Sequence, residues 1–213
     1  MTTTPVIILL HGVGSRGADL APLADGLRRH LPDARIIAPD GPEPFDQGSS
    51  GRQWFSVRGV TEANRPDRVA GARSGFDAKL RSVLTAEGVE EDLSSVALVG
   101  FSQGAIMALD VAASGRWPVG AVVAMAGRLA SPPPLAPASG TKVLLLHGEA
   151  DGVMPIRLAS EARDGLSALG VDAELQTFPG LGHGISPESL EAAGRFLTKA
   201  LRELGRSDPA SSD

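Results

Sequence analysis

Gly100-Phe101-Ser102-Gln103-Gly104 is the stretch that decides how this chain is interpreted. It follows the apolar run Val96–Val99, which predicts a buried strand, and it precedes a helical pattern. A Gly-x-Ser-x-Gly between a strand and a helix is typical of a nucleophile elbow, a sharp turn that exposes a serine hydroxyl above the sheet edge. Glycines are needed there because larger side chains would collide within the turn. We therefore predict that Ser102 is a nucleophile rather than a serine in an ordinary glycine-flanked loop.

Short apolar runs alternate with amphipathic stretches along the whole sequence. The predicted strands are Val6–Leu10, Arg35–Ala38, Val96–Val99, Ala121–Met125, Val143–Leu146 and Ala173–Thr177. The predicted helices are Leu20–Leu31, Val69–Glu87, Gln103–Ala113, Ile156–Leu169 and Pro187–Leu204. Near-continuous apolar strands indicate burial on both faces, so the pattern predicts a mostly parallel, doubly wound α/β sheet flanked by helices. We expect one domain over residues 1–204, no separate cap domain, and a disordered polar tail over residues 205–213.

Charge and composition disfavour several classes of protein. The 213 residues carry a net charge of -5 without a basic run, which does not favour nucleic acid or an anionic membrane as a partner. The absence of cysteine excludes a disulfide framework, a thiol nucleophile and cysteine-ligated zinc. No segment is apolar enough to span a bilayer, and the N-terminus lacks the basic start of a signal peptide. We expect a cytoplasmic enzyme that is a monomer or a homodimer.

A serine nucleophile needs a base and a third group that orients the base. Of the four histidines, only His183 lies in a loop after the last predicted strand, between glycines that let the loop carry the imidazole toward Ser102. The chain order serine, acid, histidine places the acid after the penultimate strand, where Glu149 and Asp151 are both within range. Asp151 is preferred because a glycine follows it and Pro155 signals a helix start, which places Asp151 at the loop apex.

Acyl transfer also requires backbone donors for the oxyanion of the tetrahedral intermediate. The amide of Gln103, directly after the serine, is one candidate donor. The second should come from the loop after the first strand, His11–Ser15, where glycines keep the backbone open. We assign the second donor to the amide of Val13.

The same loop matches a different motif. Gly12–Gly17 fits the dinucleotide fingerprint Gly-x-Gly-x-x-Gly, and Asp40 follows the second predicted strand at roughly the place of a ribose-binding acid. In such a fingerprint the helix opens within the glycines, whereas the helical pattern here begins near Leu20. A dinucleotide site would also leave Ser102 and His183 without a role, so this interpretation is disfavoured.

Together these motifs resemble the small carboxylesterase and acyl-protein thioesterase group of α/β-hydrolases, also called the phospholipase/carboxylesterase family. The resemblance spans almost the whole chain and rests on Leu10–Gly14, Gly100–Gly104, His147–Asp151, Gly182–Gly184 and Arg52–Phe55. It implies the α/β-hydrolase fold and hydrolysis of esters or thioesters without a metal or organic cofactor. It also implies the roles given above to the triad residues and the two amides, although Val13 stands where many relatives have leucine.

Residues 39–68 are rich in proline and glycine and predict an extended flap. The flap contains Phe45, Trp54 and Phe55, three of the eight aromatic residues. They either line an acyl groove beside Ser102 or pin the flap to the sheet, and both interpretations stay open.

The expected function is hydrolysis of small-molecule carboxylic esters of short or medium acyl chains through an acyl-enzyme. The alternatives within enzymes are an acyl-protein thioesterase, a lysophospholipase and a dienelactone-hydrolase-like enzyme, the last of which commonly uses a cysteine that this chain lacks. The alternative from another class is a non-catalytic binding module on a hydrolase scaffold.

Overall fold

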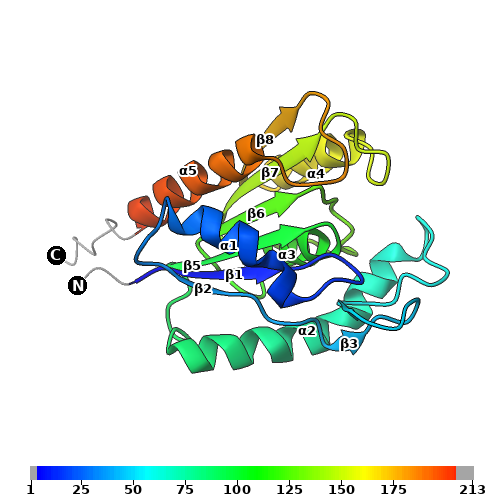
Figure 1. The fold of residues 1–213 in the computed structure, drawn as a ribbon, viewed down its shortest axis with the longest axis horizontal. Coiled ribbons are helices and arrows are strands. Elements are labelled where there is room, and N and C mark those ends of the chain that lie inside the picture. Colours follow the sequence, from blue (N-terminus) through cyan, green and yellow to red (C-terminus); the bar gives the residue numbers. More distant parts are fainter. Residues whose placement is uncertain (1–3, 205–213) are drawn as a thin grey trace.

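Six parallel strands form the central sheet of the computed structural model, which describes residues 4–204 (Figure 1). In spatial order they are β2 (Arg35–Ile37), β1 (Val6–Leu10), β5 (Val96–Phe101), β6 (Ala121–Met125), β7 (Lys142–Gly148) and β8 (Asp172–Phe178). Each neighbouring pair is parallel, so the carboxyl ends of all the strands meet at one edge. The predicted mostly parallel sheet is therefore confirmed.

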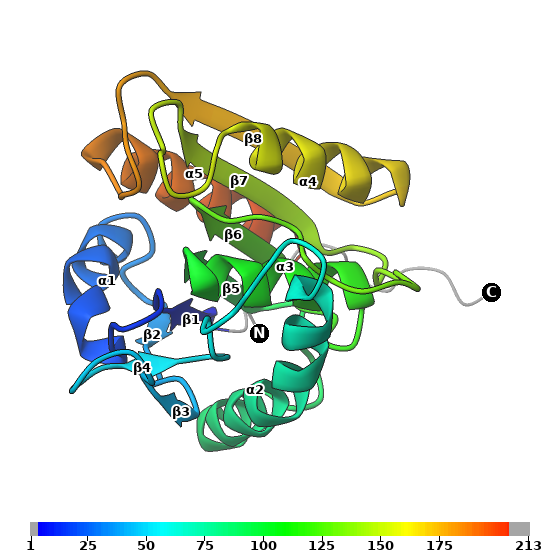
Figure 2. The same ribbon diagram turned by 90° about the vertical axis from the view of Figure 1, so that its right-hand side faces the viewer.

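Helices cover both faces of this sheet (Figures 1 and 2). One face carries α1 (Ala21–Arg28) and α5 (Pro187–Leu204), and the other carries α2 (Arg65–Glu87), α3 (Gln103–Ser114) and α4 (Arg157–Ala168). The residues of β1 alternate between the two buried clusters, because successive side chains of a strand point to opposite faces. Residues 20–31, expected as one helix, contain the end of a 3-10 turn, η1 (Gly17–Leu20), followed by the shorter α1.

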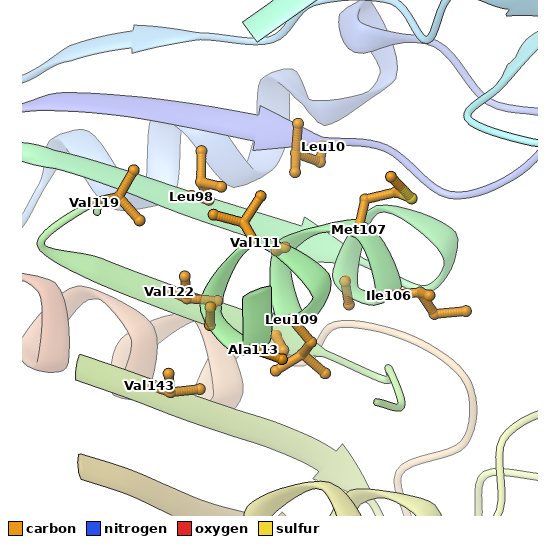
Figure 3. Packing of buried hydrophobic residues seen from close by; sticks show 14 of the residues in the cluster. Leu10, Leu98, Ile106, Met107, Leu109, Val111, Ala113, Val119, Val122 and Val143 are labelled. Carbon is orange, nitrogen blue, oxygen red and sulfur yellow. The ribbon is translucent and has the colours of Figure 1, made fainter. Parts of the chain in front are cut away.

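The helix that follows Ser102 is buried on nearly every side. Residues 103–113 of α3 are all buried, and Ile106, Met107 and Leu109 belong to the same apolar cluster as Leu98 of β5 and Val122 of β6 (Figure 3). A fully packed helix has little freedom to shift, since protein interiors are as dense as organic crystals. The turn that begins α3 is therefore held on a rigid support.

The flap contains a two-stranded antiparallel sheet that was not predicted, formed by β3 (Glu43–Pro44) and β4 (Arg52–Gln53). It is attached to the loop after β1 by backbone bonds, since Arg52 accepts from Gly14 at 2.9 Å and donates to Ser15 at 2.8 Å. The predicted tail over residues 205–213 lies outside the described residues, and the single-domain assignment stays a prediction. No helix within residues 4–204 combines the length and apolar character needed to cross a membrane.

Candidate active site

Ser102 lies in a sharp turn between β5 and α3. Its backbone has φ 52° and ψ -114°, a conformation that residues other than glycine rarely adopt. A Cβ at Gly100 would lie 2.4 Å from the carbonyl oxygen of Gly104, and one at Gly104 would lie 2.1 Å from that of Leu10. Both glycines are therefore sterically required, and the turn has the geometry that the pentapeptide predicts.

His183 lies between Ser102 and Asp151. Its Nε2 is 2.9 Å from Ser102 Oγ, and its Nδ1 is 2.8 Å from Asp151 Oδ2. An ionised carboxylate can only accept, so Nδ1 carries the hydrogen and Nε2 is free to accept the hydroxyl proton of Ser102. The structure thus brings together three side chains that the sequence analysis selected from separate loops.

The carboxylate of Asp151 is fully buried and held by hydrogen bonds. Its Oδ1 accepts from the amides of Val153 at 2.9 Å and Met154 at 2.8 Å. Burial by itself raises the pKa of Asp151, but the bonds from these amides and from His183 outweigh it and lower the pKa below the ordinary value. Asp151 is therefore ionised at neutral pH.

The other acid that the sequence allowed, Glu149, does not face His183. Its carboxylate is exposed and accepts a hydrogen bond of 2.7 Å from the hydroxyl of Thr177 on β8. Glu149 thus braces the loop after β7 against the neighbouring strand. This agrees with the choice of Asp151 as the acid.

The loops that carry Asp151 and His183 touch each other. The amide of Ala150 donates to the carbonyl of Leu181 at 2.9 Å, and a Cβ at Gly148 would lie 2.2 Å from the same oxygen. On the other side, the ring of Phe101 lies 5.2 Å from the His183 imidazole between centroids. These contacts fix the imidazole from two sides.

The two candidate oxyanion donors lie near Ser102. Gln103 follows Ser102 in the sequence, and the loop of Val13 approaches Ser102 in space. Gln103 is the first residue of α3, where amides have no acceptor within the helix. The loop of Val13 passes directly beside the serine, because a Cβ at Gly12 would lie 3.4 Å from Ser102 Cβ. Within residues 4–204, the Val13 amide donates to no backbone carbonyl.

The side chain of Gln103 has a function that sequence reasoning missed. It is buried, and its Oε1 accepts from the Trp54 amide at 2.9 Å while its Nε2 donates to the Phe55 carbonyl at 2.7 Å. The Gly-x-Ser-x-Gly pattern leaves this position open to any residue, so the sequence gives no signal of this contact. Gln103 therefore fastens the flap to the elbow.

Of the two interpretations of the flap aromatics, the structure shows the anchoring one for Trp54 and Phe55. Their exposed fractions are 1% and 4%, and the Trp54 indole donates to the carbonyl of His11 at 2.9 Å. Their buried rings leave no free surface for an acyl chain. Phe45 is only half-buried, and its ring lies against Gly14, beside a flap cavity of about 260 Å³ that also contacts Arg16.

The segment that resembles a dinucleotide fingerprint is occupied by contacts within the protein. The amide of Gly17 donates to Asp40 at 2.8 Å, and a Cβ at Gly17 would lie 1.9 Å from the carbonyl oxygen of Ala38. The glycine and the acid of that motif are thus explained by packing of η1 against the end of β2. Within the described residues, no group of three or more histidine, aspartate or glutamate side chains is arranged to hold a metal ion.

Comparison with known proteins agrees with this geometry. A family model described as Phospholipase/Carboxylesterase matches residues 1–201. The chain belongs to the phospholipase/carboxylesterase family. It is accordingly a hydrolase of the carboxylesterase type, and its sheet is that of an α/β-hydrolase.

Individual members of the family support the assignment. The chain is 35% identical over 188 residues to Esterase YpfH of Escherichia coli (strain K12), covering 88% of this chain and 79% of that protein. It is 28% identical over 213 residues to Acyl-protein thioesterase 1 of Saccharomyces cerevisiae, covering 92% of each. The crystal structure of esterase PE8 matches with a TM-score of 0.79 at 32% identity over 94% of both chains.

Proposed function

We propose that this protein is a serine hydrolase that cleaves carboxylic esters of short or medium acyl chains through an acyl-enzyme. Ser102 is the nucleophile, His183 the general base and Asp151 the group that orients the base. The observation that carries the proposal is the continuous hydrogen-bonded path from Ser102 Oγ through His183 to Asp151, with distances of 2.9 and 2.8 Å.

The reaction proceeds in two steps. The hydroxyl oxygen of Ser102 attacks the ester carbonyl while His183 Nε2 takes its proton, and the ionised Asp151 stabilises the imidazolium that forms. His183 then donates the proton to the departing alcohol, leaving the acyl group on the serine. A water molecule, activated by the same nitrogen, releases the acid and regenerates Ser102.

The amides of Val13 and Gln103 donate to the oxyanion in this proposal. One lies in the loop after β1 and the other at the start of α3. Removing one such donor typically lowers the rate about 10²–10³-fold. Because these donors are backbone groups, the donation does not depend on which residue occupies position 13.

The same chemistry would serve a thioester, and the relatives include proteins named both esterase and acyl-protein thioesterase. We favour short or medium acyl groups because residues 4–204 contain no cap domain and because Trp54 and Phe55 are enclosed in the core. An acyl-protein thioesterase or a lysophospholipase is the second candidate, and a non-catalytic binding module the remote one.

The test compares Ser102→Ala with a matched control, Ser167→Ala, at an exposed serine of α4. Both variants and the wild type are assayed on p-nitrophenyl esters and acyl thioesters of graded length, and labelled with a fluorophosphonate probe. We expect Ser102→Ala to lose labelling and at least about 10³-fold in kcat, with Ser167→Ala unchanged. Full turnover by Ser102→Ala would refute the nucleophile, and an unlabelled wild type would favour the binding module.

A further inference from the structure

A second histidine lies next to the proposed triad and takes no part in the steps described above. His147 is the penultimate residue of β7, and its side chain is 1% exposed. Val143 and Leu145, which share its face of the strand, belong to the cluster beneath α3 and α4. The loop from β7 to α4 (Figure 2) begins after Gly148, the residue that follows His147. Asp151 lies in this loop.

The Nε2 atom of His147 has two neighbours. It lies 2.7 Å from the carbonyl oxygen of Met154 and 3.4 Å from Oδ2 of Asp151. A carbonyl oxygen only accepts hydrogen bonds, so Nε2 must carry the hydrogen. The positive end of this N–H therefore faces both the carbonyl oxygen of Met154 and the carboxylate of Asp151.

These contacts close a small ring around the carboxylate of Asp151. The amide of Met154 donates to Oδ1, while the carbonyl of Met154 accepts from His147. Oδ2, which faces the His147 contact, is also the oxygen that accepts from His183. The oxygen that Asp151 presents to His183 therefore lies in a loop that the His147–Met154 bond ties to the end of β7.

We propose that His147 is a positioning residue for Asp151, a role that rests on the proposed function. Its Nε2–H holds the loop over residues 148–154 in one conformation and directs Oδ2 of Asp151 toward His183. Without this donor the buried carboxylate keeps its amide bonds, but Oδ2 loses the His147 contact and the loop loses its bond through Met154. Since a displacement of about 1 Å in a catalytic group can cost about 10²-fold in rate, His147→Leu should lower kcat about 10–100-fold. KM should stay within about twofold.

A double-mutant cycle tests whether His147 acts through Asp151. The four proteins are the wild type, His147→Leu, Asp151→Asn and the double variant, compared by kcat on one p-nitrophenyl ester. Asp151→Asn alone should cost about 10³–10⁴-fold, because the amide no longer orients and stabilises the base correctly. In that background we expect His147→Leu to cost less than about twofold, since residues that act as a unit are not additive. A full additional loss in the double variant would show an independent structural role and overturn the inference.

A second pair of variants covers the case in which His147→Leu does not fold. In His147→Gln the carboxamide nitrogen can reach the place of Nε2, whereas in His147→Asn it reaches only the place of Nδ1. We expect Gln to retain at least about a third of the wild-type kcat and Asn to lose as much as Leu. Equal activity of the two variants would also overturn the inference.

Glu149→Gln is the matched control, because Glu149 braces the same loop through Thr177 without touching Asp151. Its small effect on kcat should be the same with Asp151 or Asn at position 151. If Asp151→Asn itself leaves activity unchanged, the proposed function fails. If Asp151→Asn is inactive but the His147 cycle is additive, only the positioning role fails.

Discussion

The side chain of Gln103 and the backbone of Trp54 are joined by a buried hydrogen bond of 2.9 Å. The same carboxamide donates to the carbonyl of Phe55, so one residue satisfies two backbone groups of the flap. The backbone of Gln103 begins α3 and supplies one of the proposed oxyanion donors. The flap is therefore fastened to the same residue that would bind the oxyanion.

Replacing Gln103 with leucine should destabilise the protein by about 2–4 kcal/mol. The substitution leaves the Trp54 amide and the Phe55 carbonyl buried without partners, and each such group costs about 1–3 kcal/mol. Urea unfolding followed by tryptophan fluorescence measures the change. Gln47→Leu, at an exposed flap position, is the control and should have an effect below about 0.5 kcal/mol. Equal effects of the two substitutions would contradict the anchoring role.

Gly104→Ala should prevent folding or abolish the elbow, whereas Gly71→Ala should stabilise the protein. An added Cβ at Gly104 would lie 2.1 Å from a backbone oxygen of β1, which cannot move without disrupting the sheet. Gly71 lies in the middle of α2 with nothing within 4 Å of the added carbon, so alanine should gain about 0.5–1 kcal/mol there. Thermal unfolding and soluble yield report both outcomes. A well-folded Gly104→Ala would show that the turn tolerates rearrangement.

Asp110 in α3 should be among the most sensitive charged residues outside the candidate site. Its buried carboxylate accepts from Arg73 at 2.8 and 3.0 Å and from Arg116 at 2.7 Å. Asp110→Ala leaves two partly buried guanidinium groups without their shared acceptor, and we expect a loss of about 3–5 kcal/mol. Asp164→Ala removes an exposed ion pair with Arg163 and should cost less than about 1 kcal/mol. Chemical denaturation measures the free energy of unfolding of both variants. A loss below about 1 kcal/mol for Asp110→Ala would contradict the expected role of Asp110.

The pH dependence of stability should carry a contribution from His11. Burial lowers the pKa of His11 below its ordinary value of 6.5, and its Nε2 accepts from the amide of Gly41 at 2.9 Å, which requires the unprotonated form. In the unfolded chain His11 takes up a proton first as the pH falls, so stability is full above about pH 6.5 and decreases below it. Unfolding free energies measured between pH 5 and 8 should fall more steeply on the acid side for the wild type than for His11→Gln. Parallel curves would rule out this contribution.

The centre of the sheet could be predicted closely because its four inner strands are buried on both faces. Val6–Leu10 and Ala121–Met125 are uninterrupted apolar runs, and the structure has them with the predicted bounds. The start of α2 was missed because Arg65–Arg68 are mostly polar and show no apolar periodicity. The helix begins there because Pro66 suits its first turn and because Thr61 and Asn64 exchange hydrogen bonds just before it.

Residues of the candidate site could be predicted where the proposed chemistry needs a particular residue type. Residues that matter only through their contacts in the folded chain could not. Ser102 and His183 stand out because glycines surround both and because no other histidine follows the last strand. The contacts made by the Gln103 carboxamide and by His147 Nε2 depend on how the flap and a loop fold back, which no local pattern encodes. The β3–β4 hairpin was missed because strands of two residues are too short to show an alternation of apolar and polar side chains.

The Ser102–His183 contact joins positions 81 residues apart, and His183 reaches the serine only from the loop that leaves β8, the edge strand of the sheet. During synthesis the elbow and its glycines emerge long before that strand. In the mechanism that we propose, a nascent chain therefore holds the serine without its general base until β8 has docked beside β7. If Ser102 and His183 act as proposed, the order of the elements along the chain delays reactivity until the sheet is complete.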